Sequence, residues 1–167
     1  MRNTFSVCLL LLFTYAVISC QENNEYLGDW ELQSWSFDIE MDLNNDNTSS
    51  FNLLEETSCV NQEVLTLKSN NTLGSKKTFS SNLRVSKEGA VYKVSEKCNK
   101  GSLGFSSAFK KINDTLVLEE GGEYILNRNK LTRTFKGFIK VYNQDFSEVL
   151  ETKDLVLTYI RKYNLKK

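Results

Sequence analysis

The chain of 167 residues contains no histidine and no proline. Without histidine, Ser–His and Cys–His catalytic pairs and histidine-based zinc sites are excluded. The sequence also shows no nucleophile beside a general base and no glycine-rich phosphate loop. We therefore expect a protein that is not an enzyme and needs no cofactor. Basic and acidic residues number 21 each, and the basic ones form no long run, so nucleic acid is not an expected partner.

Long apolar runs are also missing, except at the N-terminus. Arg2 precedes an apolar segment at residues 7–13, and small side chains follow it. The apolar stretch from residue 5 to residue 19 has 15 residues, whereas a membrane-spanning helix needs about 20. This layout predicts a secretory signal peptide at residues 1–19 that is removed from the mature protein.

The predicted signal ends in Val-Ile-Ser-Cys at residues 17–20. This ending resembles the lipobox of bacterial lipoproteins, in which the chain is cut before the Cys and the Cys is lipidated. The resemblance implies a lipid anchor on Cys20, a tether at residues 20–26, and sorting to the outer membrane, since Gln21 rather than Asp follows the Cys. Several acyl chains hold a protein to a membrane far better than one. An ordinary cleaved signal and an uncleaved anchor are the alternatives.

Only four cysteines are present. Cys8 falls in the predicted signal and Cys20 at the lipidation site, which leaves Cys59 and Cys98 in the exported part of the chain. A disulfide between them is the prediction for an oxidising compartment, with an expected stabilisation of about 3–4 kcal/mol. Two free buried thiols are the alternative.

Residues 27–167 are typical of one all-β domain, with eight or nine strands joined mainly by short turns. Residues 27–39 alternate with period two, which places Trp30 and Trp35 on opposite faces of a first strand. Residues 40–58 break this pattern and predict a long loop that contains one short helix. The spacing of the later strands favours an antiparallel barrel or sandwich.

The first strand carries Leu-Gly-Asp-Trp at residues 27–30. This sequence looks like the Gly-x-Trp signature of lipocalins. The whole chain is similar to the lipocalin-like lipoproteins of Bacteroidetes, which share the long loop after the first strand and a pair of Cys. The resemblance implies an up-and-down β-barrel of about eight strands. It also implies that Gly28, Trp30 and Arg161 close one end of the barrel, with the guanidinium of Arg161 packed across the indole ring.

Apolar residues with period two predict the interior of this barrel. The residues that we expect to line a ligand cavity are Phe79, Phe105, Phe135 and Tyr159. Arg133 shares its face with Phe135, and an inward-facing guanidinium requires an anion, either a protein carboxylate or the head group of a ligand. A ligand head group would resemble the carboxylate capture of fatty-acid-binding barrels. The alternatives are that Arg133 faces outward or pairs with a glutamate.

These patterns predict an envelope lipoprotein whose barrel binds a small hydrophobic or amphipathic molecule at the membrane. The alternative is a barrel filled by its own side chains, which serves as a structural or protein-interaction module. An eight-stranded barrel allows both, since it is either filled by side chains or holds one small ligand.

The loop after the first strand contains a weak calcium motif. Asp42, Asn44 and Asp46 resemble the start of a calcium-binding loop, in which oxygen ligands alternate along the chain. However, Asn47 occupies the position of the usual Gly, and Leu53 occupies that of the usual Glu. A solvated turn built by the Asp and Asn side chains is the alternative.

Overall fold

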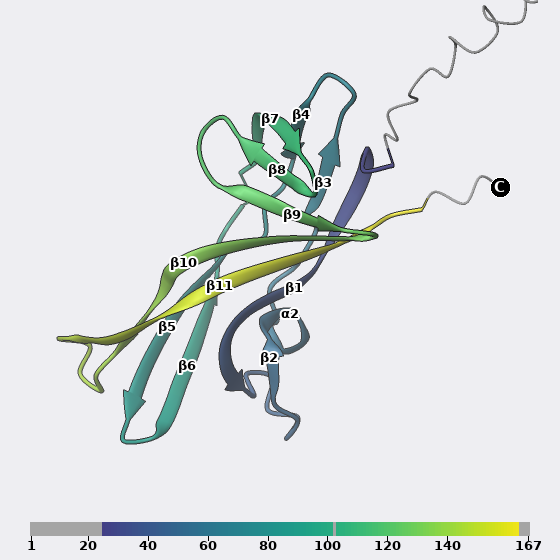
Figure 1. Cartoon of the computed structure of the whole chain (residues 1–167). Coiled ribbons are helices and arrows are strands. Elements are labelled where there is room, and N and C mark those ends of the chain that lie inside the picture. The colour runs from purple at the N-terminus through teal and green to yellow at the C-terminus, as the bar shows by residue number, and fades with distance from the viewer. Residues whose placement is uncertain (1–24, 102, 164–167) are drawn as a thin grey trace, which may run out of the picture.

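A computed structural model describes residues 25–101 and 103–163 of the chain (Figure 1). The predicted signal peptide and Cys20 lie outside the described residues. Within them, no helix is long and apolar enough to cross a membrane. The elements in chain order are β1 (Gly28–Met41), β2 (Ser50–Asn52), α2 (Leu53–Glu56), β3 (Val64–Leu67), β4 (Thr72–Ser75), β5 (Ser81–Glu88), β6 (Val91–Cys98), β7 (Phe105–Ile112), β8 (Thr115–Leu118), β9 (Glu123–Asn127), β10 (Lys130–Tyr142) and β11 (Val149–Arg161).

Eight strands close into an antiparallel barrel in the order β1, β3, β4, β7, β8, β9, β10 and β11, and β11 pairs again with β1. Each barrel strand therefore lies beside the barrel strands that precede and follow it in the chain. The predicted all-β, up-and-down barrel of about eight strands, with one short helix after the first strand, is confirmed.

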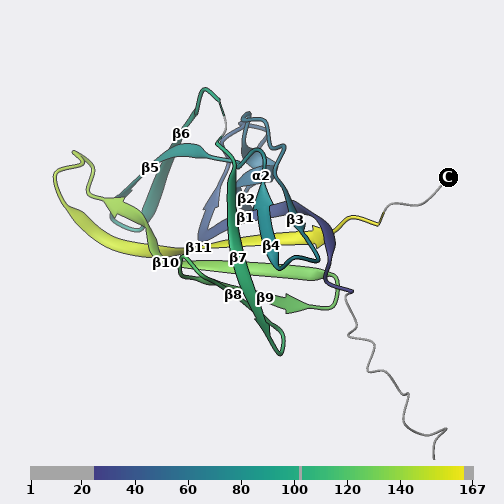
Figure 2. The same cartoon turned by 90° about the horizontal axis from the view of Figure 1, so that it is seen from above.

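Three further strands lie outside the barrel circuit. Strand β2 pairs with β1, β5 pairs in parallel with β10, and β6 pairs with β5. The three longest strands, β1, β10 and β11, continue from the barrel into this second region (Figures 1 and 2). We name the second region the distal lobe; it comprises β2, α2, β5, β6 and the parts of β1, β10 and β11 that extend alongside them.

Bulges separate the barrel from the distal lobe. In β10, the pairing with β11 shifts register between Phe135 and Ile139, and Gly137 adopts a φ of 58°. This left-handed conformation favours glycine, because a Cβ strains the backbone there. The backbone N–H of Gly137 donates to Asp154 Oδ1 at 2.8 Å, which holds the bulge against β11. The bend lets the first half of β10 belong to the barrel and its second half to the distal lobe.

A bulge in β1 changes which side chains are buried. The pairing of β1 with β11 shifts between Leu32 and Ser34. The extra residue reverses the alternation, so Trp30 and Trp35 are both buried in one core. The prediction that the two tryptophans occupy opposite faces was wrong for this reason. The core continues through the distal lobe, where Leu53 of α2 is fully buried.

Candidate ligand-binding site

A cavity of about 290 Å³ lies between the barrel strands and the segment that links β4 to β5. Its volume lies just below the range of roughly 300–1,000 Å³ that is usual for small-molecule sites. All five residues predicted to form a ligand site line it, namely Phe79, Phe105, Arg133, Phe135 and Tyr159. The structure therefore brings together side chains that are up to 80 positions apart in the sequence. Trp35, Phe138, Leu155 and Leu157 add to the apolar wall.

Arg133 provides the positive charge of the cavity. Its guanidinium carbon lies 4.4 Å from the ring centre of Phe135 and 5.1 Å from that of Tyr124. Its Nη1 donates a long hydrogen bond to Tyr124 Oη at 3.4 Å. Among the described residues, no carboxylate lies within 4.0 Å of this guanidinium. The sequence left the orientation of Arg133 open. In the structure the side chain is half-buried and lines the cavity, and it makes no direct ion pair with a glutamate among the described residues.

The turn between β8 and β9 makes room for this guanidinium. Gly122 has a φ of 87°, and a Cβ placed there would lie 2.9 Å from Arg133 Nη2. A larger residue would thus be strained and would also push against the guanidinium. The Gly121-Gly122 turn places bare backbone beside the charged end of the cavity.

Glu63 is a second ionisable group in the wall, and it was not predicted. Its side chain is 4% exposed. Oε2 accepts a hydrogen bond from the backbone N–H of Phe79 at 2.8 Å, and Oε1 accepts one from Tyr159 Oη at 2.8 Å. Burial raises the pKa of this carboxyl, although both hydrogen bonds and the charge of Arg133 oppose the rise.

Two tyrosines connect Glu63 with Arg133. The rings of Tyr124 and Tyr159 meet edge to face, with their centres 6.0 Å apart. Burial is the main cause that raises the pKa of Tyr124 and raises that of Tyr159 well above its ordinary value. Both phenols therefore remain neutral at physiological pH. They offer the cavity neutral hydroxyl groups between a cation and a buried carboxyl.

The sequence does contain a signal for Glu63. Glu63 precedes β3 and shares the period of Leu65 and Leu67, all three of which are buried. A charged residue at a core position is costly unless it is hydrogen-bonded, so its presence indicates a polar site. Tyr124 carries a weaker signal, because an interior tyrosine is common in any barrel.

The arrangement suits an amphipathic molecule with an anionic head. A carboxylate at Arg133 would accept charge-assisted hydrogen bonds from the guanidinium. The apolar body would lie against Phe105, Phe135 and Leu157. The described residues contain no group of three or more Cys, Asp or Glu side chains that could hold a metal ion.

The end of the barrel where β1 begins is closed differently from expectation. Trp30 is fully buried and donates from Nε1 to the backbone oxygen of Tyr26 at 3.0 Å. Arg161 lies opposite Trp30 in the β1–β11 pairing, as the resemblance implied. However, its guanidinium donates to the Leu27 oxygen at 3.0 Å, and the ring that it covers is that of Tyr163 rather than the indole. Gly28 has a φ of 117°.

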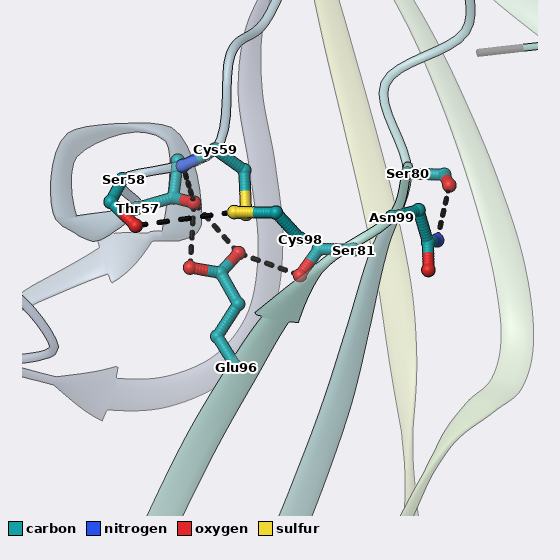
Figure 3. Close-up of a disulfide and its surroundings, with 8 residues drawn as sticks. All are labelled: Thr57, Ser58, Cys59, Ser80, Ser81, Glu96, Cys98 and Asn99. Atoms are coloured by element: carbon teal, nitrogen blue, oxygen red, sulfur yellow. Dashed lines mark hydrogen bonds between the residues drawn. A yellow bond between two sulfur atoms is a disulfide. The ribbon is translucent and has the colours of Figure 1, made fainter. Parts of the chain in front are cut away.

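The disulfide between Cys59 and Cys98 is confirmed (Figure 3). It joins the end of β6 to the segment that follows α2. Beside it, Glu96 accepts hydrogen bonds from the hydroxyl groups of Thr57 at 2.7 Å and Ser81 at 2.6 Å. Figure 3 shows these side chains converging on the Glu96 carboxylate. Together these contacts connect the outer strand of the distal lobe to its helix.

The weak calcium motif forms a network of turns. Asp42 Oδ1 and Asn44 Oδ1 accept the backbone N–H of Asp46 at 3.2 and 2.9 Å. Asp42 Oδ2 accepts that of Asn47 at 3.2 Å, and Asp46 Oδ1 accepts that of Thr48 at 2.8 Å. The oxygens that would bind calcium are hydrogen-bonded to the loop itself, as in the alternative of a solvated turn.

No family model, curated protein or solved structure matches this chain.

Proposed function

We propose that the barrel binds a small amphipathic molecule through an anionic head group, most simply a carboxylate. The observation that carries this proposal is the state of Arg133, whose guanidinium lines the cavity without a carboxylate partner within 4.0 Å in the described part of the chain. Arg133 is half-buried, and the part of its charge that is withdrawn from water gains from a counter-ion. A ligand anion would supply the counter-ion and also fill the space between the aromatic rings.

The size of the cavity limits the ligand. A volume of about 290 Å³ suits a medium-chain or aromatic carboxylate better than a two-chain lipid. Seven aromatic side chains in the wall favour a flat or flexible apolar body; they are Trp35, Phe79, Phe105, Tyr124, Phe135, Phe138 and Tyr159.

Replacement of Arg133 by Ala tests this proposal. Hydrogen bonds to charged groups contribute about 1.5–3 kcal/mol, so we expect affinity for decanoate to fall roughly 10- to 100-fold. Displacement of the fluorescent probe anilinonaphthalene sulfonate provides the measurement. Decanol is the neutral comparison: the native chain should prefer decanoate over decanol, and Arg133→Ala should lose that preference.

The matched control is Arg84→Ala. The Arg84 guanidinium also lies over an aromatic ring, 4.7 Å from the centre of Phe146, but in the distal lobe away from the cavity. This variant should bind decanoate as the native chain does. Equal, saturable decanoate binding by the native chain and by Arg133→Ala would refute the role of Arg133.

We further propose that the protein is a lipocalin-like lipoprotein of the bacterial envelope, anchored in the outer membrane through Cys20. The Val-Ile-Ser-Cys ending of the apolar segment at residues 17–20 supports this proposal. The disulfide agrees with it, because disulfides persist in oxidising compartments outside the cytosol.

A protein-interaction module is the second candidate function. It is favoured by large apolar side chains on the distal lobe that are half exposed or more and lie outside the cavity: Phe51 at 50%, Val91 at 62% and Leu150 at 50%. Native mass spectrometry of the purified protein separates the two functions. A bound small molecule of constant mass supports ligand binding, whereas a stoichiometric protein partner with an empty cavity supports the module.

A further inference from the structure

One end of the barrel collects basic side chains from parts of the sequence that are far apart. We name it the tether end. It consists of the start of β1, the β3–β4 turn (68–71), the β7–β8 turn (112–115), the β9–β10 turn (127–130) and residues 161–163. Backbone hydrogen bonds tie these segments together, since Arg161 N donates to Asn129 O at 3.0 Å and Lys162 N to Asp29 O at 2.8 Å. The β3–β4 turn is held to the neighbouring strand β7, where Phe109 N donates to Asn71 O at 2.9 Å.

The tether end is positively charged although the whole chain is neutral. Its basic residues on or beside these turns are Lys68, Lys110, Lys111, Arg128, Lys130, Arg161 and Lys162, and all but Arg161 are exposed. The acidic residues on or beside the same segments are Glu25, Asp29, Glu31 and Asp114. Of these, Asp29 accepts the Thr66 hydroxyl at 2.7 Å, and Glu31 pairs with Lys162 at 3.6 Å.

The distal lobe has the opposite character. Four of the five ion pairs among the described residues lie there, and in them the carboxylates of Glu88, Glu151 and Asp154 pair with four lysines. Exposed acidic residues remain on its surface, among them Asp38, Glu40, Asp46, Asp145 and Glu148. Positive charge is therefore concentrated at the tether end of the molecule and negative charge on the distal lobe.

Apolar side chains accompany the positive charge. Ile112 in the β7–β8 turn is 56% exposed, and Tyr163 beyond the end of β11 is 66% exposed. Aromatic and apolar side chains beside lysines are the combination that an interfacial membrane contact uses. Neither side chain is required by the barrel core, since both project from its end.

We propose that the tether end docks on a bilayer surface that contains anionic phospholipid. This inference rests on the proposed anchor at Cys20 for its biological setting, and two observations select a bilayer as the occupant. The chain leaves the barrel at Gly28, only eight residues beyond Cys20, which keeps this end within about 30 Å of an anchored lipid. The exposed lysines and arginines are complementary to phosphate head groups. The barrel then stands on the membrane with the acidic distal lobe pointing away from it.

Vesicle co-sedimentation tests this inference without the lipid anchor. Every strand, the helix and the disulfide lie within residues 28–161, so a chain that begins at residue 21 contains the whole described fold. We expect it to bind vesicles of equal parts phosphatidylcholine and phosphatidylglycerol at low salt and to lose most of that binding at physiological salt. It should not bind vesicles of phosphatidylcholine alone.

Charge reversal locates the contact. Replacing Lys110, Arg128 and Lys130 together by Glu should weaken binding to the anionic vesicles by at least about tenfold. The control replaces three other exposed lysines, Lys97, Lys100 and Lys140, by Glu; it changes the net charge equally and should weaken binding less than threefold. Thermal unfolding of both variants confirms that they fold.

Three results would overturn the inference. They are no binding of the native chain to anionic vesicles, equal loss in both triple variants, and binding to a soluble polyanion such as heparin without binding to vesicles. None of them bears on whether Cys20 is acylated, because the tested chain lacks Cys20. Decanoate binding is likewise independent, because Arg133 is unchanged.

Discussion

Glu63 shows how one residue defines the chemistry of the cavity. Its carboxyl is buried, and its two oxygens accept hydrogen bonds from Phe79 N and Tyr159 Oη. Burial raises its pKa above the ordinary value of 4.5. The folded protein therefore prefers the protonated carboxyl more strongly than the unfolded chain does. Ionised Glu63 would also weaken the field of Arg133 that attracts a ligand anion.

Glu63→Gln should change how stability depends on pH. Because the folded pKa is raised, Glu63 contributes stability that is present below pH 4.5 and is lost as pH rises through the folded pKa. Gln does not ionise and keeps one acceptor and one donor for the same partners. We therefore expect the melting temperature of Glu63→Gln, relative to that of the native chain, to rise as the pH is raised from 4 to 7. Circular dichroism provides the measurement.

Glu55→Gln is the control of opposite sign. The Ser50 hydroxyl and then the Asn52 amide lower the pKa of Glu55. The contribution of Glu55 to folding stability is present above the unfolded pKa of 4.5 and is lost as pH falls through the folded pKa. The melting temperature of Glu55→Gln should be slightly below that of the native chain at neutral pH and equal to it at acidic pH. The same pH trend in both variants would contradict the assignment of Glu63.

At the scale of elements, a long alternating segment reveals its strand in the sequence more clearly than a short or interrupted one does. β10 was predictable because thirteen residues carry one alternation, and its bulge preserves the buried face. β4 has only four residues and one large apolar side chain, Leu73, so its sequence resembled a turn. Strand β1 contains a bulge that reverses its alternation at Ser34, which the local pattern does not reveal. Such strands form because their neighbours supply hydrogen bonds.

The disulfide acts at the scale of elements, because it fixes β6 to the segment after α2. Replacing Cys59 and Cys98 together by Ser should lower the free energy of unfolding by about 3–4 kcal/mol, since the closed loop spans 39 residues. Urea unfolding measures this difference. A reducing agent should lower the stability of the native chain and leave that of the double variant unchanged; destabilisation of both by the reductant would contradict this account.

At the scale of the whole molecule, the barrel, its tether and its charge distribution belong to one proposed arrangement at a membrane. The cavity lies in the barrel, and the exposed basic residues lie at the end of the barrel where β1 begins. Strands β5 and β6 of the distal lobe lie toward the other end of the long strands β10 and β11 (Figure 1). A ligand would then be exchanged at a fixed height above the bilayer.

Cys20→Ala should release the protein from this arrangement. Without the thiol there is no site for a thioether-linked lipid, so the acyl mass should be absent from the intact protein. We expect the native chain to fractionate with membranes and to carry that added mass, and we expect the variant to lose the mass. Intact-mass spectrometry of both proteins provides the measurement. A native chain without acyl mass would instead support an ordinary cleaved signal.

The sequence by itself determined the all-β class, the number of barrel strands within one or two, and the pair of cysteines that join. It also identified five residues that share one cavity, because period-two alternation reports which side of a strand is buried. Only the tertiary structure decided that β5 and β6 leave the barrel, that Tyr124 contacts Arg133 while Glu63 lines the same cavity, and that basic residues gather at one end. Those features depend on bulges and on pairing between distant strands, which no local pattern encodes.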